Sequence, residues 1–254
     1  RRALTLAPNL PEAHVAMAQV YRFKDHDFKA ARDEAQRALQ LRPNDADAFL
    51  KLSWMESHLG HFDAAARAGE RAAALDPNDS FTAFSLALTR DMVGDYPGAQ
   101  QALMRALAID PQNAEAYASL SRLKLRTTGD IDAATRVLDS MPTGTPPNLS
   151  VSDQRISLLL YRRDFSAART LAATLAGQFG VNALHTAMLH GNVEWLAGKE
   201  AQARPFYLAV VDLLGKPSLD VTAYDLTSLG LAYARLGRAD DAVKANSAAM
   251  AMFR

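Results

Sequence analysis

The side chains that could do chemistry in this chain are six histidines and a few close pairs of acids. His58 and His61 lie three residues apart, a spacing that can let two imidazoles reach one metal ion. No His-Glu-x-x-His motif accompanies them, and they fall at the expected end of a helix, where solvated histidines are ordinary. We therefore predict that the chain holds no metal. His14 is expected to pack between helices.

Pairs of aspartates two residues apart suggest acid–base chemistry at first sight. Each pair falls at an expected helix start or turn, where an aspartate caps free N–H groups and lies near the positive end of the helix dipole. The pairs are Asp25 with Asp27, Asp45 with Asp47, and Asp130 with Asp132. The sequence carries no Gly-rich phosphate loop, no Gly-x-Ser-x-Gly elbow and no cysteine. We predict capping for all six aspartates, no cofactor, no catalytic residue and no enzyme activity.

Prolines mark the elements that must position these side chains. Pro8, Pro43, Pro77 and Pro111 follow one another at intervals of 35, 34 and 34 residues, each after a run rich in alanine and leucine. A constant period near 34 residues is typical of helix pairs stacked in a solenoid. One pair cannot bury its own apolar face, so its neighbours must complete the core.

The same residue types recur at the same places of each period. Leucine and a small residue share one face of the first helix, and a glycine follows at the turn, where a left-handed backbone favours it. Examples are Leu52, Ser53 and Gly60, then Leu86, Ala87 and Gly94, then Leu229, Gly230 and Gly237, with Gly129 at a further turn. This pattern resembles the tetratricopeptide repeat family. The resemblance implies an all-α, right-handed superhelical solenoid of antiparallel helix pairs.

The register of the repeats predicts two arrays joined by a linker. Residues 1–141 hold a partial unit, 1–8, and four regular units, and residues 154–254 hold about three, of which the first two are degenerate. Residues 142–153 contain three prolines, one glycine and two serines, lack a helical period and are the predicted linker. An extra residue near 25–27 is expected to lengthen a loop. Because the chain starts at Arg1 inside a unit, we expect it to be a fragment of a longer protein.

Composition narrows the classes of partner. Lys and Arg number 28 and Asp and Glu 28, so the net charge is zero, and we predict no nucleic-acid binding. No apolar run reaches the roughly 18 residues that a membrane-spanning helix needs, so we predict no membrane insertion. A chain without cysteine fits the cytoplasm and the periplasm equally, so its localisation stays open.

In the tetratricopeptide repeat family, variable positions of the first helices line a concave groove. Trp54, Phe84 and Leu88 are large apolar residues at such positions, which marks an interaction surface unless a neighbouring helix or the closing superhelix covers them. Arg122 and Arg126 lie four residues apart and either meet an acidic segment or remain solvated. The predicted groove residues are Leu50, Trp54, His58, Phe81, Phe84, Leu88, Met92, Arg122 and Arg126.

The resemblance implies a scaffold that binds a peptide or helix of a protein partner in this groove, with self-association left open. The clamp for a C-terminal carboxylate that one subtype of the family carries is not expected, because only Lys51 is cationic near the corresponding positions. Two alternatives remain. One is a regulatory or substrate-presenting arm of a larger bacterial enzyme or transcriptional regulator, with a cyclase, kinase, glycosyltransferase or DNA-binding module. The other is an adaptor in envelope export or secretion.

Overall fold

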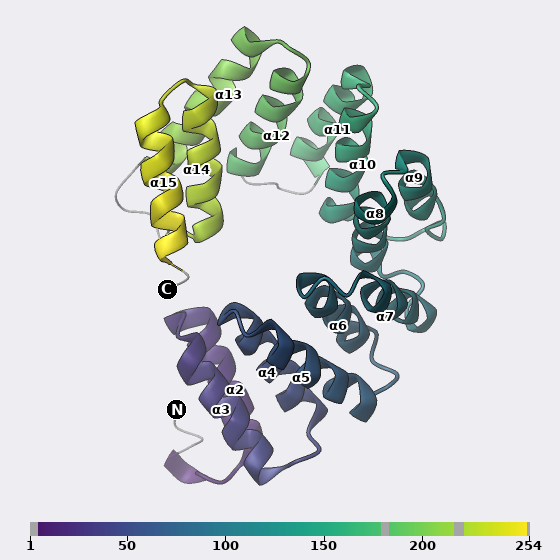
Figure 1. Cartoon of the computed structure of the whole chain (residues 1–254), viewed down its shortest axis with the longest axis vertical. Helices are drawn as coiled ribbons and strands as arrows, with labels where there is room; N and C mark the ends of the chain where they lie inside the picture. Colours follow the sequence, from purple (N-terminus) through teal and green to yellow (C-terminus); the bar gives the residue numbers. More distant parts are fainter. Residues whose placement is uncertain (1–4, 179–182, 216–220, 253–254) are drawn as a thin grey trace. The chain divides into compact units, whose positions relative to one another are not determined.

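Helices account for nearly all of the chain that the structure describes. The computed structural model describes residues 5–178, 183–215 and 221–252, and these form fourteen α-helices and one π-helical turn with no strand (Figure 1). The prediction of an all-α fold of helix pairs is confirmed. Internal contacts divide the chain into two units, residues 1–146 and 147–254, which are described separately below.

Each even-numbered helix is the first helix of a pair, and the odd-numbered helix after it is the second. The first unit contains α2 (Pro11–Val20), continued by η1 (Tyr21–Asp25), then α3 (Phe28–Leu41), α4 (Ala46–His58), α5 (Phe62–Leu75), α6 (Ser80–Met92), α7 (Tyr96–Ile109), α8 (Ala114–Thr128) and α9 (Ile131–Asp139). The second unit contains α10 (Leu149–Tyr161), α11 (Phe165–Gln178), α12 (Ala183–Leu196), α13 (Glu200–Leu214), α14 (Ala223–Arg235) and α15 (Ala239–Ala251).

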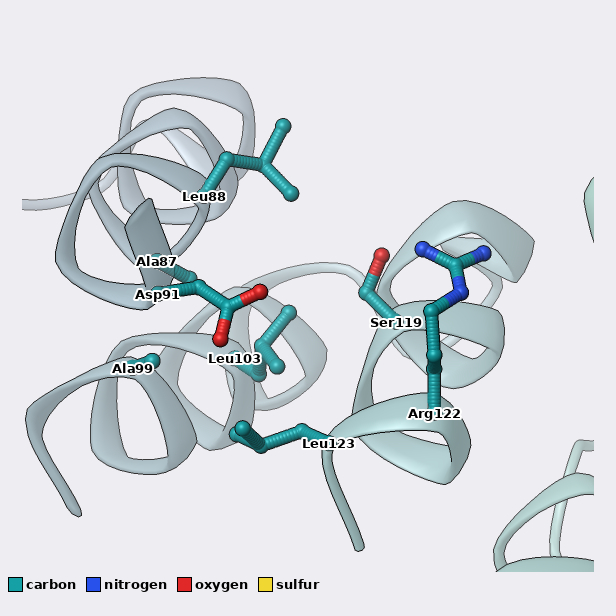
Figure 2. A pocket seen from close by; sticks show the side chains of 8 residues that line it. All are labelled: Ala87, Leu88, Asp91, Ala99, Leu103, Ser119, Arg122 and Leu123. Carbon is teal, nitrogen blue, oxygen red and sulfur yellow. The ribbon is translucent and has the colours of Figure 1, made fainter. Parts of the chain in front are cut away.

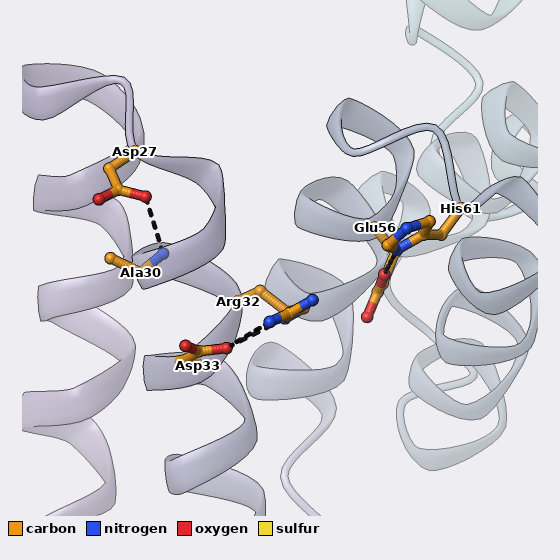
Figure 3. A network of polar contacts seen from close by, with 6 residues as sticks. All are labelled: Asp27, Ala30, Arg32, Asp33, Glu56 and His61. Atoms are coloured by element: carbon orange, nitrogen blue, oxygen red, sulfur yellow. Dashed lines mark hydrogen bonds and ion pairs between the residues drawn. The ribbon is translucent and has the colours of Figure 1, made fainter. Parts of the chain in front are cut away.

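Aspartates begin several of these helices. The side chain of Asp27 accepts a hydrogen bond from the backbone N–H of Ala30 at 2.9 Å (Figure 3). Asp45 and Asp130 cap α4 and α9 in the same way. The capping prediction is therefore confirmed for one member of each pair, and Asp47 and Asp132 lie in a first turn, near the positive end of the helix dipole as expected. The remaining member, Asp25, lies in η1.

The predicted turn glycines all adopt a left-handed backbone. Their φ angles are +78° at Gly60, +80° at Gly94, +67° at Gly129 and +78° at Gly237. Side chains rarely tolerate this region, so glycine fixes the place where each first helix ends. The turn prediction is confirmed at these four positions.

The extra residue of the first repeat does not lengthen a loop. It is absorbed in the π-helical turn η1, where the backbone N–H groups of His26 and Asp27 both reach back to the carbonyl oxygen of Tyr21. The earlier expectation is wrong because widening a helical turn keeps the backbone hydrogen-bonded, whereas a loop would leave those groups open. As a result, Arg22 and Phe23 are held on helical backbone.

Small side chains let the helices approach closely. Ala31, Ala65 and Ala72 are fully buried on the second helices, and the Ser53 hydroxyl donates a hydrogen bond to the Ala65 carbonyl oxygen at 2.8 Å. The first helices α2 and α4, and α4 and α6, also contact each other directly. The inner face of the first unit is our name for the surface on the side of these contacts. It is formed by η1, α4, α6 and α8.

The stretch between the two units is shorter than the predicted linker 142–153. α10 already begins at Leu149, because the Asn148 side chain caps it by accepting from the Val151 N–H at 3.2 Å. The division between the two units lies between Pro146 and Pro147. Whether the arrays 1–141 and 154–254 act as separate domains stays a prediction. Residues 1–4 of the partial unit 1–8 lie outside the described residues.

Candidate functional site

Two of the predicted groove residues belong largely to the core. Leu50 is only 4% exposed, so its placement in the groove is wrong. The reason is that α4 packs against both α2 and α6, which encloses this position. Phe84 is half-buried and packs against the buried cluster that includes Ala83 and Leu86, so only part of its ring faces outward.

Trp54 lies at the centre of a cluster of rings and cations. The Arg22 guanidinium carbon lies 4.5 Å and the Lys51 Nζ 4.4 Å from its ring centroid. Phe81 meets it edge-on, with 5.6 Å between the ring centroids. Phe23 lies under the same Arg22 guanidinium at 4.5 Å. We call these five side chains the Trp54 cluster.

The Trp54 cluster presents apolar surface on the inner face. Phe23 is 65% exposed and Phe81 is 51% exposed, while Trp54 is half-buried beneath its neighbours. Side chains from η1, α4 and α6 lie against the Trp54 ring, and Trp54 also packs on the buried cluster that includes Ala31 and Ala35 of the second helix α3. Aromatic and arginine side chains grouped in this way are typical of binding hot spots.

The two cations of the Trp54 cluster differ in their partners. Lys51 pairs with Asp47 at 2.9 Å, one helical turn away. Arg22 has no carboxylate partner among the described residues, and its burial lowers the pKa of its guanidinium. An arginine remains charged at any ordinary pH, so Arg22 is a cation held on an aromatic surface and only partly hydrated.

A narrow cleft lies further along the inner face, between α6 and α8 over α7. Figure 2 shows Leu88 and Arg122 on opposite walls, with Asp91 pointing into the space between them. The cleft has a volume of about 20 Å³, room for about one water molecule. Leu88 is 39% exposed. We call this feature the Leu88 cleft.

The arginines of α8 behave differently from each other. Arg126 pairs with Asp91 across the cleft and also lies over the Tyr96 ring, 4.7 Å from its centroid. Arg122 is exposed and has no carboxylate partner among the residues that the structure describes. Of the two predicted arginines, Arg126 is therefore paired within the unit, whereas Arg122 is not.

Two further predicted groove residues, His58 and Met92, lie outside the Trp54 cluster. His58 stacks on Phe28 of α3, with 4.4 Å between ring centroids, and its Nδ1–H donates to the Trp54 carbonyl oxygen at 2.7 Å. Met92 lines a wide hollow of about 550 Å³ beside the turn that contains Gly60 and Phe62. Both side chains are exposed, Met92 to 59%, and His58 is held by its stacking on Phe28 and its hydrogen bond.

His61 and His14 of the first unit have structural partners. His61 donates from Nδ1 to the Glu56 carboxylate at 2.7 Å (Figure 3), and the buried His14 lies between Glu34 and the Pro8 carbonyl. The expected packing of His14 between helices is confirmed. Within the described ranges, no group of three or more His, Cys, Asp or Glu side chains is placed to hold a metal ion. No described helix has the length and apolar character to cross a membrane.

Sequence reasoning named no candidate residue in the second unit, where the structure places Arg163 over Phe165, Arg238 over Tyr233 and Arg235 over Trp195. The Arg235 guanidinium lies 4.5 Å from the ring centroid of Trp195, and Trp195 meets Tyr207 edge-on at 6.3 Å. Both residues lie near the end of a first helix, Trp195 three residues before the turn glycine Gly198 and Arg235 two residues before Gly237.

Comparisons with known proteins identify the repeats. Family models described as tetratricopeptide repeat match residues 17–80 and 92–150. No curated protein sequence matches the chain.

Solved structures share the architecture. A tetratricopeptide repeat protein from Parabacteroides merdae is 13% identical with a TM-score of 0.68, covering 95% of this chain and 93% of that one. PilF of Pseudomonas aeruginosa is 18% identical with a TM-score of 0.63, covering 81% and 92%. PilW, a type IV pilus biogenesis factor, is 16% identical with a TM-score of 0.57, covering 81% and 92%. At these identities the likeness shows the fold.

Proposed function

Because the chain is a tetratricopeptide repeat protein, whose fold generally serves as a protein-interaction scaffold, we propose that the inner face of its first unit binds a protein partner without catalysing a reaction. The bound segment is a peptide or a helix that lies across η1, α4, α6 and α8. The Trp54 cluster and the Leu88 cleft provide the contacts.

One observation carries this proposal, the apolar stripe on α6. Phe81, Phe84 and Leu88 lie at i, i+3 and i+7, so they share one face of the helix. Phe81 and Leu88 are both more than a third exposed, although the buried core of the repeat is complete without them. Exposed apolar side chains in a row are the anchors that a peptide or helix needs, and burying them contributes about 25 cal/mol per Å².

The polar side chains beside the stripe support binding rather than chemistry. Asp91 is neutralised by Arg126, and Asp47 is neutralised by Lys51. Paired charges of this kind orient the surface, and neither pair places a base beside a nucleophile.

Peptide selection tests the proposal. Peptides are selected on the wild-type chain from a random dodecapeptide display library, and their affinities are then measured by calorimetry for the double variant Phe81→Ser/Leu88→Ser. Truncating an anchor typically costs more than about 1 kcal/mol, so we expect binding to weaken by at least about tenfold.

The matched control is Met104→Ser. Met104 is 56% exposed in the same unit, but it lies on the second helix α7. Equal affinities for the wild-type chain and the Phe81→Ser/Leu88→Ser variant would show that the stripe is not the binding surface.

A further inference from the structure

We infer that the segment bound by the inner face is acidic, and that its carboxylates pair with Arg22 and Arg122 on either side of the apolar stripe. This inference rests on the proposed function and specifies the chemistry of the partner.

Two arginines on the inner face have no ion pair within the described part of the chain. Three acids of the unit are already paired with other cations: Glu12 with Arg42, Asp47 with Lys51 and Asp91 with Arg126. Arg22 and Arg122 are left without a carboxylate among the described residues. Although the whole chain has a net charge of zero, these two arginines are therefore open to a carboxylate of a partner. Complementary charge on a partner both attracts it and fixes its register.

Arg22 is the better prepared of the two cations. Its guanidinium is fixed against the rings of Trp54 and Phe23, each with its centroid 4.5 Å away, so little side-chain freedom is lost when a ligand binds. Burial has removed part of its hydration, and a carboxylate that accepts two of its N–H groups would replace the missing water.

Arg122 combines charge with an apolar contact. It stands across the Leu88 cleft from Leu88 (Figure 2), so one residue of a ligand can pair with its guanidinium while the next covers the Leu88 methyl groups. The cleft itself is too small for an aromatic ring, since it has a volume of about 20 Å³. A small apolar residue beside an acidic residue therefore fits this place.

The spacing of the helices gives the length of the segment. Packed helices lie roughly 10 Å apart, so the three steps from η1 through α4 and α6 to α8 span roughly 30 Å. An extended chain advances about 3.3 Å per residue, which places the two carboxylates about eight or nine residues apart with apolar residues between them. A dodecapeptide covers this distance.

The random dodecapeptide library is the probe for this test, and the peptides selected on the wild-type chain are sequenced. Peptides that bind the wild-type chain should be enriched in Asp and Glu at least about twofold over the unselected library. Charge-assisted pairs at partly exposed sites are modest, so Arg22→Gln and Arg122→Gln should each weaken these peptides about three- to tenfold, and the double variant by roughly the product. Arg37→Gln, on the exposed side of α3, is the matched control and should change nothing.

The outcomes separate the inference from the proposed function. Selected peptides that show no acidic enrichment, yet lose affinity with Phe81→Ser/Leu88→Ser, would overturn the acidic partner and leave the binding surface standing. If the peptides show no acidic enrichment and also bind the Phe81→Ser/Leu88→Ser variant with unchanged affinity, both the acidic partner and the proposed binding surface are overturned. Tighter binding of a 20-nucleotide single strand than of the selected peptides, lost in the arginine double variant, would replace the acidic peptide by a phosphate backbone.

Discussion

Substituting Gly191 by alanine tests how closely the helices of the second unit pack. Gly191 lies on α12, and a Cβ added there would lie 2.9 Å from Cε1 and 3.2 Å from Cζ of Tyr207 on α13. Ordinary carbon–carbon contacts are about 3.5–4.0 Å, so the ring would have to move by more than half an ångström. Tyr207 is fully buried and its hydroxyl donates to Asn192 at 2.9 Å, which resists that movement.

Two effects of opposite sign decide the result. Replacing glycine by alanine inside a helix stabilises the folded state by about 1 kcal/mol. Overpacking costs about 1–3 kcal/mol, and weakening the Tyr207 hydrogen bond adds about 1 kcal/mol. We therefore expect Gly191→Ala to lower the free energy of unfolding of the second unit by about 1–3 kcal/mol.

The chain provides a reporter for this measurement. It has two tryptophans, Trp54 in the first unit and Trp195 in the second, and Trp195 contacts Tyr207. In a Trp54→Phe background, Trp195 fluorescence during urea unfolding follows the second unit alone. Adding Tyr207→Phe should make the cost of Gly191→Ala smaller, because a ring without its hydroxyl bond can move. A more stable Gly191→Ala protein would refute the close packing of α12 and α13.

Three further predictions concern a turn, the core and pH. Gly94→Ala should destabilise the first unit by about 1–2 kcal/mol in urea unfolding, because an alanine is strained at the φ of +80°. No atom lies within 4 Å of the added Cβ, so the cost comes from the backbone alone, and Gly94→Asn should cost less. Met55→Ala should cost about 2–5 kcal/mol, whereas the exposed Met104→Ala should change stability by less than about 0.5 kcal/mol; equal costs would contradict the assigned core. The hydrogen bond with Asp153 raises the pKa of His185 in the folded protein. The pair therefore stabilises the fold fully at a pH below the unfolded-state pKa of about 6.5, and this stabilisation is lost as the pH rises through the higher folded-state pKa. Asp153→Asn should remove this pH dependence from the urea midpoint, and an unchanged profile would show that the pair contributes nothing.

The sequence predicts well the features that depend on local backbone chemistry. Gly60 and Gly94 mark turns because few other residues tolerate a left-handed backbone, and Asp27 and Asp45 mark helix starts because their side chains accept from free N–H groups. The π-helical turn at Tyr21–Asp25 was not predictable in the same way, since an inserted residue can widen a helix or lengthen a loop without changing residue types.

The candidate site was harder to predict because it depends on contacts between repeats. The frame identified Phe81 and Leu88 correctly as positions on the first helix, but it could not show that Leu50 is enclosed by two neighbouring helices. Nor could it show that Asp91 neutralises Arg126 and leaves Arg122 unmatched. Such pairings depend on the directions of side chains at the interface between two repeats. The spacing of residues within one repeat does not predict these directions.

Photo-crosslinking tests the proposed binding surface most directly. Leu88 is replaced by p-benzoylphenylalanine, and in a matched control Met104 on α7 is replaced instead, after which each protein is irradiated with a peptide selected on the wild-type chain. Both positions are exposed in the same unit, on a first and on a second helix. We expect the peptide to crosslink at position 88 and not at position 104. Crosslinking at position 104 alone, or equally at both, would contradict binding on the inner face.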